Sequence, residues 1–144
     1  STGNPYPWAQ GPRRMNTDKN ADVLWTGNSW GSTLARIDTK TNEVKMVPFP
    51  DQANQPYQLH VDSQHNVWGS LWTNDQIYKY DPSTEKFTFF TFPVRGSEDR
   101  HIFVDERSGQ IKITTPVYRV NQMAVMTVRS EQDIAKLKQT ALAQ

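Results

Sequence analysis

Several features are missing from this 144-residue chain. It has no cysteine, which excludes a disulfide scaffold, thiolate metal ligands and a thiol nucleophile, although it does not fix the redox compartment. No run of 18 or more apolar residues occurs, so we expect no membrane-spanning helix. The first four residues, STGN, lack the charged and apolar regions of a signal peptide, and a leader removed earlier would leave no trace.

An excess of charge of either sign is missing as well. Sixteen Lys and Arg residues face fifteen Asp and Glu residues, which gives a formal net charge of +1. A surface for general polyanion binding needs a clear basic excess, and no DNA-binding motif is present. The sequence therefore predicts no nucleic-acid partner.

What the sequence does contain is a repeat. The stretch STLARIDTKTNEVKMVPFP returns 43 residues later as DQIYKYDPSTEKFTFFTFP. Pairs matched at this offset include Trp25 and Trp68, Leu34 and Ile77, Asp38 and Asp81, and Asp62 and Asp105. A period of roughly 40–45 residues, with several short strands in each unit, is typical of a propeller blade.

Each copy reads as four short strands separated by turns. In the second copy, YQLHVD, NVWGS, QIYKYD and KFTFFTF are rich in β-branched and aromatic residues. The turn after Asp81 has a mechanism, because Asp can accept a hydrogen bond from the backbone two residues on and Pro82 presets φ. Its counterpart after Asp38 has Asn42, which tolerates a positive φ. We predict an all-β fold, a partial β-propeller with blades at about residues 12–50, 56–93 and 99–129.

The two ends of the chain depart from the repeat. Residues 1–11 contain prolines around an aromatic pair and are predicted to form an extended arm or linker. After the strand QMAVMTV, the fourth strand of the third blade does not follow. Instead, SEQD indicates a helix cap, and Ile134, Leu137, Ala141 and Leu142 follow at helical spacing, so we predict a helix over residues 131–144.

Fewer than three complete blades cannot close a propeller, which typically has 4–8 blades. We expect the missing blades to come from a longer parent chain, of which this would be the C-terminal part. The alternatives are a second copy of the chain, forming a six-bladed ring, and an open stack of blades. Apolar strand residues that would need cover are Val44, Met46, Met123 and Met126, and the C-terminal helix could shield part of this surface.

Two stretches carry a family resemblance. GPRRMNTDKNADVLWTGNSWGSTLARIDTKTNEV and PYQLHVDSQHNVWGSLWTNDQIYKYDPSTEKFTFFTFP resemble blades of the streptogramin lyase (virginiamycin B lyase) propellers, a group similar to NHL-type propellers. The resemblance spans about residues 11–128. It implies a propeller that opens a cyclic depsipeptide at its ester by elimination, with Mg²⁺ as cofactor and with Glu and His residues near the central cavity. Because many relatives look like domains of extracytoplasmic proteins, it also implies a periplasmic or secreted location.

The resemblance supplies two catalytic candidates. Glu98 and His101 lie in EDRH, which is similar to the family's Glu-x-His approach to an inner strand. The family pattern places further Glu and His residues on the next connecting loop, where this chain has Tyr118 and Arg119 instead, so no acidic cluster for Mg²⁺ is left and the metal site stays undetermined. The competing interpretation is that His101 is a structural residue bonded to backbone.

Propeller geometry predicts a second kind of site. Loops that lead into inner strands and loops that join the second strand of a blade to the third typically share one face. These positions are occupied by Arg13, Arg14, Trp30, Tyr57, Gln58, Trp72, Arg100, His101, Tyr118 and Arg119. Arginine forks bind carboxylates or phosphates, and aromatic faces stack rings or cations. The alternative for Trp30 and Trp72 is packing between blades, which is the expected role of Trp25 and Trp68.

Three classes of function therefore remain. The leading one is a propeller domain that binds a small-molecule ligand or a partner. The second is a lyase-like enzyme in which Glu98 and His101 belong to a composite site completed by the missing blades. The third is a platform for protein–protein interaction, and the fold alone does not choose among the three.

Overall fold

The computed structural model describes residues 9–142, which form three antiparallel sheets followed by one helix. The first sheet contains β1 (Pro12–Asp18), β2 (Val23–Asn28), β3 (Thr33–Asp38) and β4 (Val44–Pro48). The second contains β5 (Pro56–Val61), β6 (Val67–Leu71), β7 (Gln76–Asp81) and β8 (Lys86–Thr91). The third contains β9 (Phe103–Asp105), β10 (Lys112–Val117) and β11 (Gln122–Thr127), with the 3₁₀ helix η2 (Tyr118–Val120) between the last two. The helix α1 spans Glu131–Leu142.

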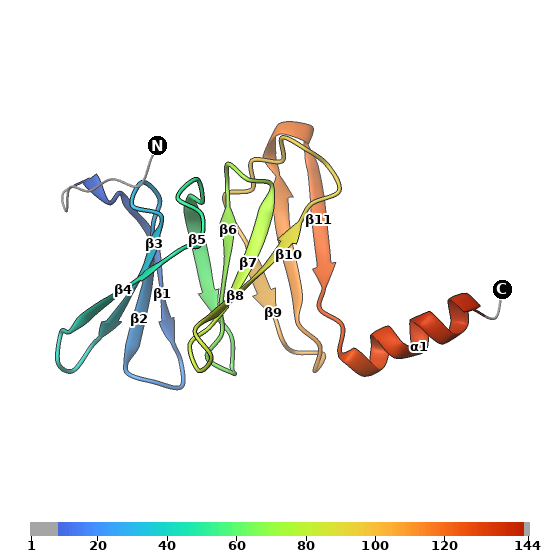
Figure 1. Cartoon of the computed structure of the whole chain (residues 1–144), viewed down its shortest axis with the longest axis horizontal. Coiled ribbons are helices and arrows are strands. Elements are labelled where there is room, and N and C mark those ends of the chain that lie inside the picture. The colour runs from blue at the N-terminus through green and yellow to red at the C-terminus, as the bar shows by residue number, and fades with distance from the viewer. Residues whose placement is uncertain (1–8, 143–144) are drawn as a thin grey trace.

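The sheets are successive blades of a partial β-propeller. Strand order in each sheet follows chain order, and the sheets stand side by side with β1 packed against β5 (Figure 1). The third sheet has three strands, so the predicted absence of its outer strand is confirmed within the described part of the chain. The predicted N-terminal arm falls largely on residues 1–8, outside the described residues.

Two apolar layers hold the blades together. The layer between the first and second blades contains Trp25, which is 2% exposed, together with Leu59 and Tyr78. Its equivalent between the second and third blades contains Trp68, which is 1% exposed, and Ile113. The two tryptophans thus occupy equivalent buried positions at successive junctions, as the repeat predicts. Within the described residues both clusters lie between blades and neither lies inside a single blade, which is the general property of stacked repeats.

The Asp-led turns form by the predicted mechanism. Asp38 Oδ1 accepts hydrogen bonds from the backbone N–H groups of Lys40 and Thr41, both at 2.9 Å. Asp81 Oδ1 accepts from the backbone N–H of Ser83 at 2.8 Å. Asn42 has φ +63°, in the left-handed region that Asn tolerates. The side-chain bonds therefore fix the hairpins that set each blade's register.

The C-terminal helix begins with the predicted cap but lies elsewhere than expected. Ser130 Oγ accepts from the Asp133 N–H at 3.1 Å, and Asp133 Oδ2 accepts from the Ser130 N–H at 3.1 Å. The helix extends away from the sheets (Figure 1), and both Ile134 and Leu137 are exposed. The expectation that it shields the open blades is wrong, because its weakly apolar face finds no sheet to pack on. No helix of the described residues is long and apolar enough to cross a membrane.

The strand residues predicted to need cover fall into two groups. Val44, Met46 and Met123 are exposed, as expected. Met126 is instead packed against the layer that contains Trp68, so its prediction is wrong. Strand alternation explains the difference, because Met123 and Val125 share the outer face of β11 and Met126 points to the opposite face.

Candidate ligand-binding rim

One end of the blades gathers the residues predicted from propeller geometry. Each sheet is an antiparallel meander, so the segment that leads into its inner strand and the turn between its second and third strands lie at the same end. We call this surface the arginine–aromatic rim and define it by Arg13, Arg14, Trp30, Tyr57, Trp72, Arg100, Tyr118 and Arg119.

On the first blade, the rim consists of arginines set against rings. The Arg13 guanidinium carbon lies 5.2 Å from the ring centroid of Trp30 and 5.5 Å from that of Tyr57. The guanidinium carbon of Arg14 lies 5.9 Å from the same Tyr57 ring. Trp30 packs against Gly11, where a Cβ atom would come within 2.8 Å of the indole. Backbone and arginine together thus hold Trp30 in place, while 45% of it stays exposed.

The contacts continue onto the second and third blades. The rings of Tyr57 and Trp72 lie 5.8 Å apart, and Arg100 lies 5.3 Å from the Trp72 centroid. Arg100 also lies 5.4 Å from the ring of Tyr118, which is 68% exposed. Cation–π pairs at such distances are attractive. The rim is therefore continuous across all three blades, with exposed rings at both ends.

Packing between blades, the alternative role for Trp30 and Trp72, has a different outcome for each residue. Trp30 is exposed, so packing between blades is not its role in this structure. Trp72 is partly buried and touches Tyr57 of its own blade as well as Arg100 of the next. Trp72 therefore packs between two blades and also lines the rim.

Glu98 lies inside the rim but is held by two cations. Its carboxylate forms ion pairs with Arg100 Nη2 and Arg119 Nε. Hydrogen bonds from Arg100 and then from Arg119 lower the pKa of Glu98, so it stays ionised at neutral pH. A general base must accept a proton readily near the working pH, and a carboxylate stabilised in this way is a weak one.

His101 is placed at the surface just before β9. Its backbone carbonyl accepts a hydrogen bond from Thr115 Oγ1 at 2.7 Å, and its ring lies 5.9 Å from that of Tyr57. Within residues 9–142 its imidazole forms no hydrogen bond, and none joins it to Glu98. The structure thus places both catalytic candidates in one region without assembling them into an acid–base pair.

Gln58 has a structural bond that the sequence did not indicate. Its Oε1 accepts from the backbone N–H of Ile102 at 3.2 Å, which ties β5 to the segment before β9. The amide also approaches His60 at 3.5 Å. This side chain therefore joins the second and third blades beside the rim.

A buried carboxyl lies next to the rim and was missed from the sequence. Asp99 is 0% exposed, and neither of its oxygens has a hydrogen-bond partner in the described part of the chain. The Ser97 hydroxyl is committed to Asp75, at 2.7 Å. Burial raises the pKa of Asp99 to about 8. The repeat offers a signal that could have found it, since 43 residues earlier stands the fully buried Pro56.

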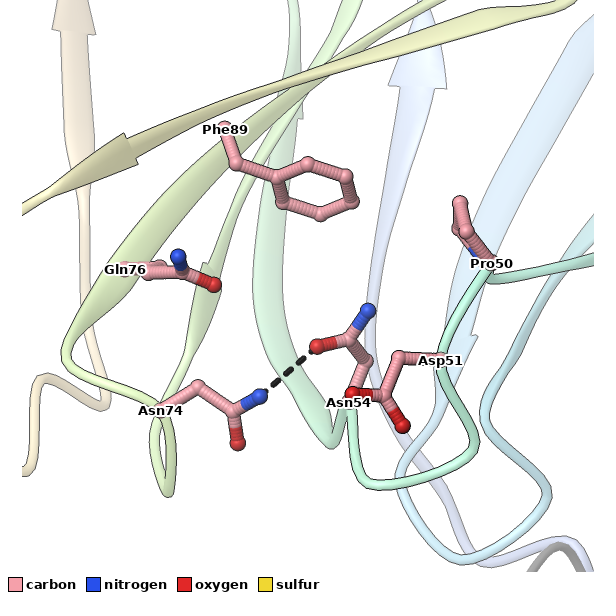
Figure 2. A pocket seen from close by; sticks show the side chains of 6 residues that line it. All are labelled: Pro50, Asp51, Asn54, Asn74, Gln76 and Phe89. Atoms are coloured by element: carbon pink, nitrogen blue, oxygen red, sulfur yellow. Dashed lines mark hydrogen bonds between the residues drawn. The ribbon is translucent and has the colours of Figure 1, made fainter.

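Two of the hollows among the described residues lie near this end of the blades. One, of about 430 Å³, is lined by Pro50, Asp51, Asn54, Asn74, Gln76 and Phe89. Figure 2 shows that Asn54 and Asn74 meet inside it, and Asn74 Nδ2 donates to Asn54 Oδ1 at 2.7 Å. The other, of about 270 Å³, is lined by Trp72, Thr73, Asp75, Gly96, Glu98 and Arg119. Only the second has a rim arginine in its lining, Arg119, which stands there beside the carboxylates of Asp75 and Glu98.

The Mg²⁺ ion that the family resemblance implies does not fit the described residues. Among residues 9–142, no three His, Asp or Glu side chains gather as a cation site. The Glu98 carboxylate is already neutralised by two arginines, and Asp99 is buried. Mg²⁺ prefers several carboxylate and water oxygens in octahedral geometry, which this set does not offer.

Comparisons with known proteins establish the fold. No protein-family model and no curated protein sequence matches the chain. Among solved structures, a streptogramin B lyase matches at 15% identity and a TM-score of 0.67, covering 89% of this chain and 44% of its own. The virginiamycin B lyase from Staphylococcus aureus matches at 14% identity and a TM-score of 0.68, covering 90% and 45%. An auxiliary nutrient binding protein from Bacteroides thetaiotaomicron matches at 13% identity and a TM-score of 0.57, covering 83% and 32%.

These likenesses show a β-propeller fold of the lyase type, as the sequence resemblance implies. At such identities they carry the fold and no activity. The chain spans less than half the length of the lyase chains that it matches.

Proposed function

We propose that this chain is the ligand-binding part of a β-propeller and that its arginine–aromatic rim holds an anionic, ring-bearing small molecule. The observation that carries the proposal is the continuous contact series across three blades, with Trp30 and Tyr118 exposed at its ends. Exposed rings offer faces for stacking, and arginines offer forks for carboxylates.

The charge at the rim favours an anion. Four arginines stand there, against two ionised carboxylates, Glu98 within the rim and Asp75 in the hollow beside it, whose pKa values are both lowered. Asp99 adds little negative charge at neutral pH, because burial raises its pKa to about 8. Local positive charge of this kind attracts anions even though the whole chain is nearly neutral.

A lyase-like elimination is the second candidate function. The likeness to streptogramin lyases and the exposed His101 beside Tyr57 favour it. The commitment of Glu98 to two arginines weighs against it, because a base and an enolate-stabilising group are both needed. In an assembly with all its blades, Mg²⁺-dependent opening of a cyclic depsipeptide that is lost in both His101→Ala and Glu98→Gln would establish the enzyme.

We propose a periplasmic or secreted location, as the family resemblance implies. We also propose that the rest of the ring comes from further blades of a parent chain or from a second copy of this chain. The open first and third blades support the second proposal, since Met123 and Val125 lie exposed on β11, whose outer edge pairs with no other strand of the described residues. A platform for protein partners would use the same open surfaces.

The binding proposal is tested with a matched pair of probes, naphthalene-2-carboxylate and the uncharged naphthalene-2-carboxamide. We expect saturable ¹H–¹⁵N shifts at the rim, with the carboxylate favoured by about tenfold because a charge-assisted arginine pair is lost in the amide. Arg13→Gln and Tyr118→Ala should each weaken binding. Arg107→Gln and Phe103→Ala, which remove an exposed arginine and an exposed ring outside the rim, should not. Equal binding of the two probes, or shifts away from the rim, would refute the proposal.

A further inference from the structure

The Glu98 ion pairs form an unusual arrangement for a surface bridge. The side chain is only 12% exposed and spans Arg100 and Arg119 from two connecting segments of the third blade. Its backbone has φ +48°, in the left-handed region that non-glycine residues rarely adopt. Backbone conformations of this kind are concentrated at ligand clamps and switch regions, where the surrounding contacts hold them.

Two hydrogen-bond donors near this carboxylate have no acceptor. Glu98 accepts from Arg100 Nη2 and Arg119 Nε, but Arg100 Nε is buried without an acceptor. The indole Nε1 of Trp72, whose ring lies 5.3 Å from the Arg100 guanidinium, is also buried without one. Buried polar groups in native proteins are almost always satisfied, so two unmatched N–H groups at one place indicate that another oxygen-bearing group belongs there.

The hollow of about 270 Å³ beside these residues gives such a group room. Trp72, Glu98 and Arg119 line it together with Asp75, so the carboxylate and one of its arginines border the hollow, and the buried indole N–H of Trp72 lies in one of its lining side chains. The preceding segment is fixed separately, because Gly96 and Ser97 donate their backbone N–H groups to Asp75 at 2.8 and 2.7 Å. The Glu98 side chain can therefore rotate away from the arginines without loss of the loop's anchor.

We propose that Glu98 is an internal competitor, whose carboxylate occupies the place between Arg100 and Arg119 that the carboxylate of a bound ligand takes. The inference rests on the proposed function and names the group that the rim recognises, a planar carboxylate attached to a ring. On binding, the ligand displaces Glu98 from the arginines, and its second oxygen accepts from the unmatched donors. Glu98 then sets selectivity, because only a ligand that replaces its two ion pairs gains access.

If Glu98 competes with the ligand, replacing Glu98 should strengthen binding of the carboxylate probe, whereas a catalytic or purely structural role does not predict stronger binding. In Glu98→Gln, the affinity for naphthalene-2-carboxylate should rise by about tenfold, since both the competition and the repulsion between like charges are removed. The affinity for naphthalene-2-carboxamide should change less than about twofold, because the amide carries no charge. The matched control is Glu43→Gln, which removes one exposed carboxylate from a distant turn of the first blade and should leave both affinities as in the unchanged protein.

A second measurement uses the unchanged chain and does not depend on how the variant folds. On saturation with naphthalene-2-carboxylate, the ¹³C carboxyl resonance of Glu98 should move to the position of a solvated glutamate. An unmoved resonance, or a Glu98→Gln affinity equal to or below that of the unchanged chain, overturns the competitor while leaving the proposed function in place. If neither protein binds the carboxylate at the rim, the proposed function fails and this inference fails with it.

Discussion

Replacing Trp68 tests the blade register most directly. The indole is buried between the second and third blades, where it stacks on Phe90 with ring centroids 5.8 Å apart. Its Nε1 donates to Asp62 Oδ2 at 2.7 Å, and Asp62 is itself buried. Trp68→Ala therefore removes a large core side chain and one donor to a buried carboxylate. We expect the free energy of unfolding to fall by about 3–5 kcal/mol, the usual range for such truncations.

The two parts of this cost can be separated. Trp68→Phe keeps a ring in the layer but removes the N–H, so it should cost about 1–3 kcal/mol for the partly unsatisfied Asp62. Asp62 Oδ2 retains the bond from Asn66 Nδ2 at 3.0 Å, which keeps this cost below that of the full truncation.

Equilibrium urea unfolding followed by far-UV circular dichroism measures these changes, provided that the slope of each transition is the same. Trp25→Ala should also cost several kcal/mol, because Trp25 is the equivalent buried residue of the first junction, but less than Trp68→Ala, whose indole also donates to the buried Asp62. The exposed Trp30 is the control, and Trp30→Ala should cost under about 1 kcal/mol. A Trp68→Ala cost below about 1 kcal/mol, or one no larger than that of Trp30→Ala, would show that the strand register is wrong.

Three further predictions concern the core and the open surface. Tyr78→Phe should stabilise the chain by about 1 kcal/mol, because the buried hydroxyl has no hydrogen-bond partner. Gly69→Ala should destabilise it by about 1–3 kcal/mol, because the new Cβ would lie 2.2 Å from that hydroxyl, so thermal melts of the two variants should shift in opposite directions. Burial raises the pKa of Asp99 to about 8. Its favourable contribution to the free energy of unfolding is therefore complete below the pKa that Asp99 has in the unfolded chain, and it is lost as pH rises to about 8. In urea titrations, the stability gained by Asp99→Asn over the unchanged chain should be largest at about pH 8 and smallest at about pH 5. Exposed Val44 and Met123 should drive association at micromolar concentration, and a monodisperse, cooperatively folding monomer in sedimentation would contradict this.

The sequence by itself determined the blades. Strand alternation and Asp-led turns are local signals, and their return after 43 residues is enough to place Trp25 and Trp68 at equivalent buried sites. It also placed the rim residues at one end, because an antiparallel meander leaves no other place for those loops. These inferences about position hold because they depend on short-range geometry, and the repeat contains the same local pattern more than once.

The tertiary structure decided what each of these residues does. Glu98 was a candidate base from its sequence neighbours, but two arginines that meet it in space hold it as a stable carboxylate. Asp99 stands at the repeat position of Pro56, but the rise in its pKa comes from burial, which that alignment does not predict. The C-terminal helix was predicted correctly, whereas its direction away from the sheets was not. Charge partners, desolvation and the packing of one element on another depend on contacts between residues far apart in the chain, and a local pattern does not contain them.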